Sequence, residues 1–213
     1  SNGKSSVVTI VTEILKAAGF SVQCGGNIGI PALDLLIEPN PDFYVLEVSS
    51  FQLESVQDFS PRVAAILNLS ADHMDRYQDF EDYVDAKLKI AKKAKHVVVH
   101  YDEKTRLQNL NSRQPTTFSA NLAHSADCKL RGRKGSLFLG VHGNQGVAFE
   151  SLRLKGGHHV ENALAAIAIT NLVGASNEAQ TIALTEFSGL EHRTEFVGDW
   201  NNVTWVNDSK GTN

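Results

Sequence analysis

The first residues of the chain have types and spacing suited to binding a nucleoside triphosphate. Residues 1–6 are Ser-Asn-Gly-Lys-Ser-Ser, and they run directly into the apolar-periodic stretch 7–15. At a helix start, glycine lets backbone N–H groups approach phosphates, lysine reaches the outer phosphates, and the serine hydroxyl ligates Mg²⁺. Taken alone, the Gly-Lys-Ser step fits an ordinary first helical turn equally well. Its meaning therefore depends on the rest of the chain.

Two more clusters follow along the chain. Residues 25–31, Gly-Gly-Asn-Ile-Gly-Ile-Pro, are either a loop that fits closely around a ligand or a plain connecting turn. Residues 47–54, Glu-Val-Ser-Ser-Phe-Gln-Leu-Glu, begin with an acid at the end of an apolar stretch. Such an acid is the usual holder of Mg²⁺ opposite a phosphate loop. The alternative for Glu47 is a strand-end carboxylate that faces water.

A fourth cluster, residues 68–77, is Asn-Leu-Ser-Ala-Asp-His-Met-Asp-Arg-Tyr. His73 can ligate a metal or polarise an oxygen, although a lone histidine is more often structural. Packing alone hardly explains Asp72, His73, Asp75 and Arg76 in one strand-to-helix loop. This cluster is therefore a candidate part of a reaction site.

Helical and strand patterns alternate along the chain, which predicts an α/β fold with a mostly parallel sheet flanked by helices. The expected helices cover residues 5–18, 79–93, 159–173 and 178–187, and the expected strands cover residues 43–48, 62–69, 96–100 and 203–206. Ligands of such a sheet bind past the carboxyl ends of strands and at helix starts. The four clusters are expected at these places.

The pattern changes between residues 115 and 154, where short segments alternate with turn residues. This stretch predicts an antiparallel hairpin or meander appended to the parallel sheet. Gly189-Leu190 indicates a boundary, and the tail beyond it resembles the beginning of another domain.

Bulk composition excludes several classes of protein. The net charge of −4 over 213 residues gives no reason to expect a nucleic-acid or membrane partner. The two cysteines, Cys24 and Cys128, lie far apart and form no metal-type pair. With no signal peptide and no apolar run of membrane-spanning length, we expect a cytoplasmic protein with buried or inert cysteines.

Together, the motifs resemble those of the Mur ligases, most closely the members that add D-glutamate. The resemblance is carried in order by Ser-Asn-Gly-Lys-Ser (1–5), Gly-Gly-Asn-Ile-Gly-Ile-Pro-Ala-Leu (25–33), Leu-Glu-Val-Ser-Ser-Phe-Gln-Leu-Glu (46–54), Asp-His-Met-Asp-Arg-Tyr (72–77) and Asn-Asp-Ser-Lys-Gly-Thr-Asn (207–213). The alternatives are another Mur ligase, a ligase like folylpolyglutamate synthase, or a non-catalytic nucleotide-binding module.

The resemblance implies an ATP-dependent ligase of peptidoglycan precursor synthesis in the bacterial cytoplasm, which serves cell-wall biogenesis, cell shape and cell division. It would join D-glutamate to UDP-N-acetylmuramoyl-L-alanine through an acyl phosphate. Residues 1–189 would be the P-loop NTPase-like central ATP-binding domain, truncated within its phosphate loop. Residues 190–213 would begin a truncated C-terminal Rossmann-like domain. We therefore expect a fragment with little activity alone, from a monomeric parent.

The resemblance also implies roles for individual residues, with ATP, two Mg²⁺ ions and CO₂ (as a lysine carbamate) as cofactors. The expected ATP-binding residues are Asn2, Gly3, Lys4, Ser5, Ser6, Asn162, Arg193 and Asp208. The expected substrate-binding residues are Asn27, Ser49, Asp72, Lys210 and Thr212. The expected metal ligands are Ser5, Glu47, His73 and carbamylated Lys87. The expected catalytic residues are Lys4, Glu47, His73 and Lys87. His159 departs from the asparagine that the family has there, so it is a weaker candidate.

Lys87 would carry the carbamate. Only the neutral amine captures CO₂, and a lysine with a pKa of about 10.4 is neutral roughly once in 10³ molecules at pH 7. The modification therefore needs a depressed pKa or a stabilised product. The alternative is a helix-surface lysine like its neighbours Lys89, Lys92 and Lys93.

Overall fold

The structure, a computed structural model, describes residues 2–37, 39–71, 74–108, 114–133, 135–191, 195–201 and 203–209. Its helices are α1 (Lys4–Ala17), α2 (Ser50–Ser55), α3 (Phe80–Lys92), α4 (Lys104–Gln108), α5 (Gly157–Asn171) and α6 (Asn177–Glu186). Its strands are β1 (Val22–Gly26), β2 (Phe43–Glu47), β3 (Val63–Ile66), β4 (His96–His100), β5 (Thr116–Ser119), β6 (Cys128–Arg133), β7 (Ser136–Val141), β8 (Val147–Ala148), β9 (Glu195–Trp200) and β10 (Val203–Asn207).

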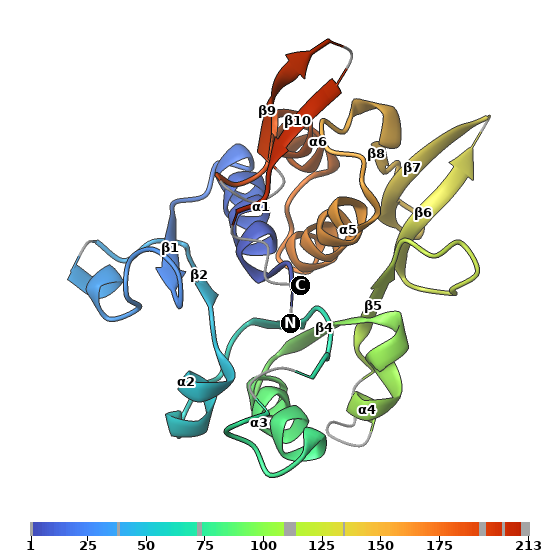
Figure 1. The fold of residues 1–213 in the computed structure, drawn as a ribbon. Coiled ribbons are helices and arrows are strands. Elements are labelled where there is room, and N and C mark those ends of the chain that lie inside the picture. Colours follow the sequence, from blue (N-terminus) through green and yellow to red (C-terminus); the bar gives the residue numbers. More distant parts are fainter. Residues whose placement is uncertain are drawn as a thin grey trace.

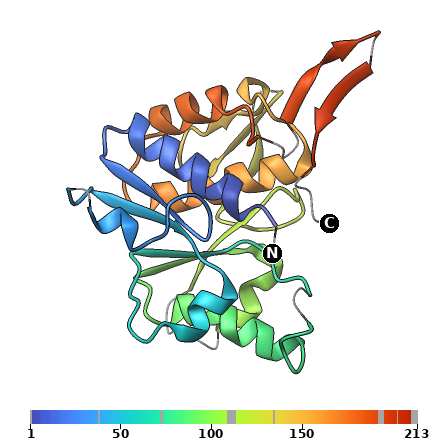
Figure 2. The same cartoon turned by 60° about the vertical axis from the view of Figure 1, so that its left-hand side comes forward.

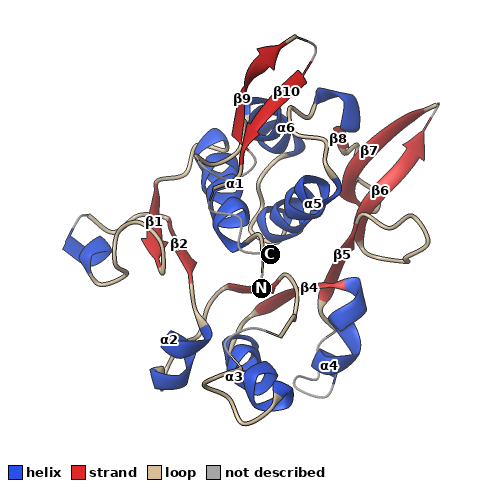
Figure 3. Ribbon diagram, in the orientation of Figure 1, coloured by secondary structure: helices blue, strands red, loops and turns tan. Residues whose placement is uncertain are grey.

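The strands form three groups (Figure 3). β1 and β2 make a parallel pair, and β9 and β10 make an antiparallel hairpin. The third group has the order β3-β4-β5-β6-β7-β8, parallel as far as β6 and antiparallel from there. The predicted mostly parallel sheet with an appended meander is confirmed. The expected meander began too early, because β5 extends the parallel part through a non-local pairing that turn residues cannot reveal.

Helices cover the strands from two sides. In Figure 2, α1, α5 and α6 lie on one side of the strands, and α2, α3 and α4 lie on the other. The larger apolar core lies under α1 and α5 and contains Ile14 and Leu164, both 0% exposed. A smaller core under α3 contains Val84 and Val99. The helices are therefore fixed by burial of their apolar faces.

The expected helix ends follow from local chemistry. α1 ends before Gly19, whose φ of +87° is left-handed backbone that favours glycine. The N–H of Phe20 then donates to the carbonyl of Leu15 at 3.1 Å, which satisfies one of the last carbonyls of the helix. At the start of α3, Asp79 accepts a hydrogen bond from the N–H of Asp82 at 2.9 Å. All four predicted helices and all four predicted strands are present.

The tail contains one strand more than expected. β9 pairs with β10 across a turn at Asn201, and the hairpin projects from the rest of the chain (Figure 1). The sequence pattern did not predict β9, because Gly198 and Asp199 lie inside it and both residue types are depleted in strands. Trp200 and Trp205 are 60% and 55% exposed on this hairpin.

Two composition-based expectations bear on the described residues. Cys24 and Cys128 are both free, and Cys128 is fully buried, which raises the pKa of its thiol. None of the described helices has the length and apolar character needed to cross a bilayer.

Leu164 at the centre of α5 provides a test of the core. It is 0% exposed, so Leu164→Ala should leave a cavity and lower the free energy of unfolding by roughly 2–5 kcal/mol. Urea unfolding followed by circular dichroism measures the loss. Ile182→Ala on α6 is the control, because Ile182 is 44% exposed and its loss should cost less than about 0.5 kcal/mol. Equal losses in the two variants would contradict this description of the core.

Candidate active site

The start of α1 is tied to the segment that follows β3. The backbone N–H of Asn2 donates to Asn68 Oδ1 at 2.9 Å, and Asn68 Nδ2 donates to the carbonyl of Asn2 at 3.0 Å. Gly3 has a φ of +84°, so its left-handed backbone favours glycine. Asn68 belongs to the fourth sequence cluster, but its pairing with the phosphate loop was not foreseen. The first and fourth clusters therefore meet.

Glu47 brings three of the four clusters together. Ser5 Oγ donates to Glu47 Oε2 at 2.8 Å, and Asn27 Nδ2 donates to Glu47 Oε1 at 3.0 Å. Glu47 and Ser5 are only 4% and 5% exposed. The alternative in which Glu47 faces water is therefore wrong. A buried carboxylate beside a helix-start hydroxyl offers the oxygen ligands that Mg²⁺ prefers.

The parallel pairing of β1 with β2 creates this convergence. Gly26 lies opposite Glu47 in the register, and the N–H of Asn27 donates to the carbonyl of Glu47 at 2.8 Å. A Cβ on Gly26 would come within 2.3 Å of that carbonyl oxygen, and the φ of Gly26 is +107°. Glycine is therefore required here, and the second cluster is partly the end of a strand rather than only a loop.

Ser49 caps α2. Its hydroxyl accepts from the N–H of Gln52 at 3.3 Å, and Gln52 Oε1 accepts from the N–H of Ser49 at 2.9 Å. This reciprocal arrangement is a capping box, which satisfies two backbone N–H groups at the helix start. The structure thus gives Ser49 a local role, and its contact with substrate stays a prediction.

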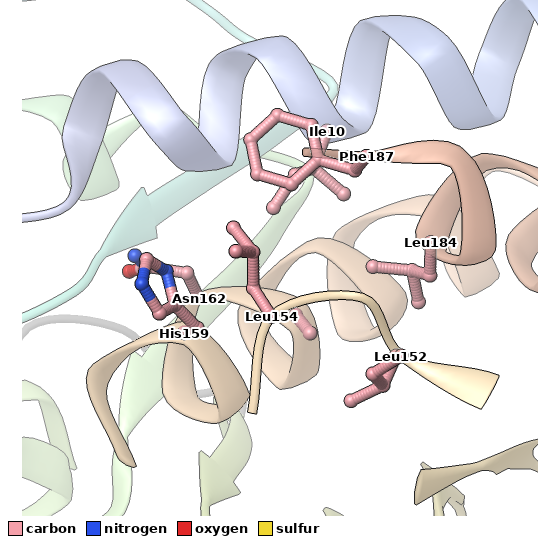
Figure 4. Close-up of a pocket in the computed structure, with 8 residues that line it drawn as sticks. Ile10, Leu152, Leu154, His159, Asn162, Leu184 and Phe187 are labelled. Carbon is pink, nitrogen blue, oxygen red and sulfur yellow. The ribbon is translucent and has the colours of Figure 1, made fainter. Parts of the chain in front are cut away.

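Asn162 lies in the second turn of α5 and against the phosphate loop. A Cβ on Gly3 would come within 2.3 Å of Asn162 Oδ1, so the two residues are in close contact. Asn162 also lines a small pocket with apolar side chains from α1, α5 and α6 (Figure 4). The expected ATP-binding residues Gly3 and Asn162 are therefore brought together from distant parts of the sequence.

His159 lines the same pocket and stays neutral. Burial, aided by the neighbouring His158, lowers the pKa of His159 to about 4, while the charge of Asp208 opposes the shift. Its Nε2 is buried without a hydrogen-bond partner among the described residues.

Lys87 lies on α3 with its ammonium group against an aromatic ring. Its Nζ is 4.2 Å from the ring centroid of Tyr83, which is 1% exposed. Lys87 is half-buried, whereas Lys89 and Lys92 on the same helix are exposed. The environment of Lys87 therefore differs from that of a surface lysine, which favours a specific role.

Several expected site residues fall outside the described part of the chain, namely Asp72, His73, Arg193, Lys210 and Thr212. Within the described ranges, no three His, Cys, Asp or Glu side chains form a cluster able to hold a metal. Ser5 and Glu47, both described, instead bring together two oxygen atoms of the kind that Mg²⁺ prefers, and we call them the metal-type pair.

A histidine–glutamate contact beside the site escaped the sequence analysis. Glu161 Oε1 accepts from the N–H of Ala120 at 2.8 Å and lies 3.5 Å from His100 Nε2. The bond to Glu161 raises the pKa of His100, with smaller contributions from Asp102 and Glu103, although burial opposes the shift. The sequence did contain two signals of this contact. His100 ends the predicted strand 96–100, and Glu161 is next to the candidate Asn162.

This contact predicts a pH-dependent stability. Because the folded-state pKa of His100 lies above its ordinary 6.5, its contribution is complete below about pH 6.5 and is lost as pH rises through the folded pKa. The stability difference between the unsubstituted chain and His100→Gln should therefore shrink from pH 6 toward alkaline pH. Urea unfolding across this range measures it. A constant difference would contradict the assigned contact.

The fold and this site define an α/β domain in which a Gly-Lys-Ser helix start faces a strand-end carboxylate, the arrangement of a nucleoside-triphosphate-binding domain. The family model described as the Mur ligase middle domain matches residues 1–170. The chain therefore belongs to the Mur ligase middle-domain family.

Comparison with curated relatives is more specific than the family model. The chain is 44% identical over 216 residues to UDP-N-acetylmuramoylalanine--D-glutamate ligase of Haemophilus influenzae (strain 86-028NP), and 41% identical over 215 residues to the protein of that name from Salmonella typhi. All of this chain is covered in both cases, but only 48% of each relative. The chain thus spans about half the length of these relatives.

Solved structures support the fold. MurF ligase from Thermotoga maritima in complex with ADP has a TM-score of 0.72 at 21% identity, covering 98% of this chain and 51% of that one. MurF from Acinetobacter baumannii has a TM-score of 0.73 at 22% identity, covering 98% and 49%. At these identities, the similarity concerns the fold alone.

Proposed function

We propose that the chain is the central ATP-using part of a bacterial cytoplasmic ligase that joins D-glutamate to UDP-N-acetylmuramoyl-L-alanine in peptidoglycan synthesis. The curated relatives support this substrate pair, since they carry the name UDP-N-acetylmuramoylalanine--D-glutamate ligase over the whole of this chain. ATP would activate the substrate carboxylate as an acyl phosphate, and the amine of D-glutamate would displace phosphate. Residues 190–213 would begin the domain that supplies the amino acid.

The convergence of Ser5, Asn27 and Glu47 is the observation that carries this proposal. Lys4 would hold the outer phosphates, and the backbone of Gly3 would approach them closely. Ser5 and Glu47 would hold one Mg²⁺, because a hydroxyl 2.8 Å from a buried carboxylate supplies two suitable oxygen atoms. The bound ion would offset the repulsion between triphosphate and carboxylate.

Other residues would place the reactants. Asn2, Ser6, Asn162, Arg193 and Asp208 are proposed to contact ATP. Asn162 has the strongest support, since it touches Gly3 and lines the pocket beside α1. Asn27, Ser49, Asp72, Lys210 and Thr212 are proposed to contact the two substrates. Asn27 already donates to Glu47 and so lies at the metal-type pair.

Lys87 is proposed to carry a carbamate that, together with His73, holds a second Mg²⁺. The half-buried position of Lys87 on α3 supports this role, because burial favours the neutral amine that reacts with CO₂. The contact with Tyr83 fixes the position of the Lys87 amine, although it also stabilises the ammonium form. Metal binding to the carbamate would have to outweigh that contact.

Substrate-dependent ADP release tests the proposal. The complete ligase should release ADP only when UDP-N-acetylmuramoyl-L-alanine, D-glutamate and Mg²⁺ are all present. Replacing D-glutamate with L-alanine or diaminopimelate distinguishes the other Mur ligases, and a folate substrate distinguishes the folylpolyglutamate synthase type. ATP binding without turnover would show a non-catalytic nucleotide-binding module. The 213 residues alone should show little or no ligation, and full turnover by them would refute the partial-domain assignment.

A further inference from the structure

Tyr77 lies between α2 and α3. Its hydroxyl donates to Glu54 Oε1 at 2.5 Å. Its ring stacks on that of Phe51, with centroids 6.4 Å apart, and meets the ring of Tyr83 edge-on at 5.3 Å. Tyr77 therefore contacts two side chains of α2 and one side chain of α3.

Glu54 receives a second neighbour on its other oxygen. Arg76 Nη2 donates to Glu54 Oε2 at 2.8 Å, and the guanidinium lies 4.6 Å from the ring centroid of Phe51. We call Phe51, Glu54, Arg76 and Tyr77 the Glu54 clamp. Arg76 and then Tyr77 hold the pKa of Glu54 below its ordinary value, and burial raises the pKa of Tyr77. At neutral pH Glu54 is consequently a carboxylate, Arg76 a guanidinium ion and Tyr77 a neutral phenol.

The clamp determines where α2 lies. Six residues are too few to form a stable helix alone, so α2 depends on its contacts with the rest of the fold. Leu53 is 4% exposed and anchors one face. The clamp holds Phe51 and Glu54 of the helix and links them to residues 76 and 77 after β3. The same helix begins at Ser50, three residues after Glu47 of the metal-type pair.

The clamp also reaches Lys87 through one aromatic ring. Tyr77 packs on the edge of Tyr83, and the Lys87 ammonium lies 4.2 Å from the centroid of that same ring. Packed interiors transmit displacements, because they contain few voids into which a side chain can relax. Loss of the Tyr77 hydroxyl bond would therefore loosen the ring against which Lys87 lies.

We propose that Glu54 and Tyr77 are positioning residues for Lys87, holding its amine where a carbamate can form and stay bound. The inference rests on the role proposed above for Lys87. In that step the lone pair of the neutral amine forms an N–C bond to CO₂. One C=O electron pair moves onto oxygen, and the nitrogen loses a proton to solvent. Glu54 and Tyr77 touch no reacting atom.

Bicarbonate dependence of the complete ligase tests this role. Tyr77→Phe removes only the hydroxyl, and Glu54→Gln removes only the charge. Each variant should need roughly tenfold more bicarbonate for half-maximal activity, the change that losing one hydrogen bond to a charged group produces. At saturating bicarbonate the rate should return to near that of the unsubstituted enzyme. The carbamate signal in ¹³C NMR with labelled bicarbonate should weaken in parallel.

Controls separate positioning from general damage. Glu81→Gln changes the same charge on α3 and breaks the 3.0 Å pair with Arg106, away from the clamp, so bicarbonate dependence should not change. Unaltered bicarbonate dependence and carbamate signal in Tyr77→Phe would overturn the inference, whatever its thermal stability. If Lys87→Ala is inactive in that case, the proposed role of Lys87 stands and only the positioning role fails. Full activity of Lys87→Ala would overturn both.

Discussion

Replacing Lys87 with alanine should lower the kcat of the complete ligase by about 10³-fold, because the substitution removes the charged group that would hold the second metal ion. Small carboxylates such as formate or acetate should restore part of the activity, since they can occupy the space of the lost carbamate. ADP release as a function of added carboxylate measures both effects.

Lys89→Ala is the matched control for this experiment. Lys89 lies on the same helix but is exposed, so its loss should leave both kcat and the response to carboxylates unchanged. Circular dichroism establishes that both variants fold. An unchanged rate in Lys87→Ala would remove this lysine from the site.

Glu47→Ala should lower kcat by roughly 10²–10³-fold, because the substitution removes the buried carboxylate at the metal-type pair. The Mg²⁺ concentration needed for half-maximal activity should rise as well. Ser5→Ala should show the same direction with a smaller effect, since a neutral hydroxyl binds the cation more weakly than a carboxylate. Magnesium titrations of ADP release measure these changes.

Glu150→Ala controls for the loss of an acidic side chain. Glu150 is exposed and pairs with Lys155 on the surface, so kcat and magnesium dependence should not change. A Glu47→Ala variant with unaltered magnesium dependence would contradict the role proposed for the pair of Ser5 and Glu47.

Glu47→Ala and Lys87→Ala test different parts of the proposed active site. Glu47 is the last residue of β2 and faces the start of α1, whereas Lys87 lies on α3, on the other side of the strands from α1 (Figure 2). Helix α2 and the Glu54 clamp connect these parts through packed side chains. We therefore expect loss of either residue to affect turnover more than folding.

Local sequence patterns determined most of the secondary structure. The apolar period of residues 7–15 and the helix end at Gly19 predicted α1, and the run of valines at 97–99 predicted β4. These elements follow from burial of apolar faces and from backbone preferences that act over a few residues. Motifs within the same segments indicated phosphate chemistry and the Mur ligase family.

Pairing between distant segments came only from the tertiary structure. The parallel position of β5, the pairing of β9 with β10 and the contact of Gly3 with Asn162 join residues whose local sequence does not encode the partner. The same holds for burial of Glu47, which depends on Ser5 and Asn27 approaching from other elements.

The chemistry proposed for this protein follows from residue types and spacing, because phosphate and metal recognition demand particular side chains at helix starts and strand ends. Only the folded chain decided which of those side chains are buried, which hydrogen bonds they make, and which ring supports Lys87. Burial and hydrogen-bond geometry are properties of elements packed together, and no single segment contains them.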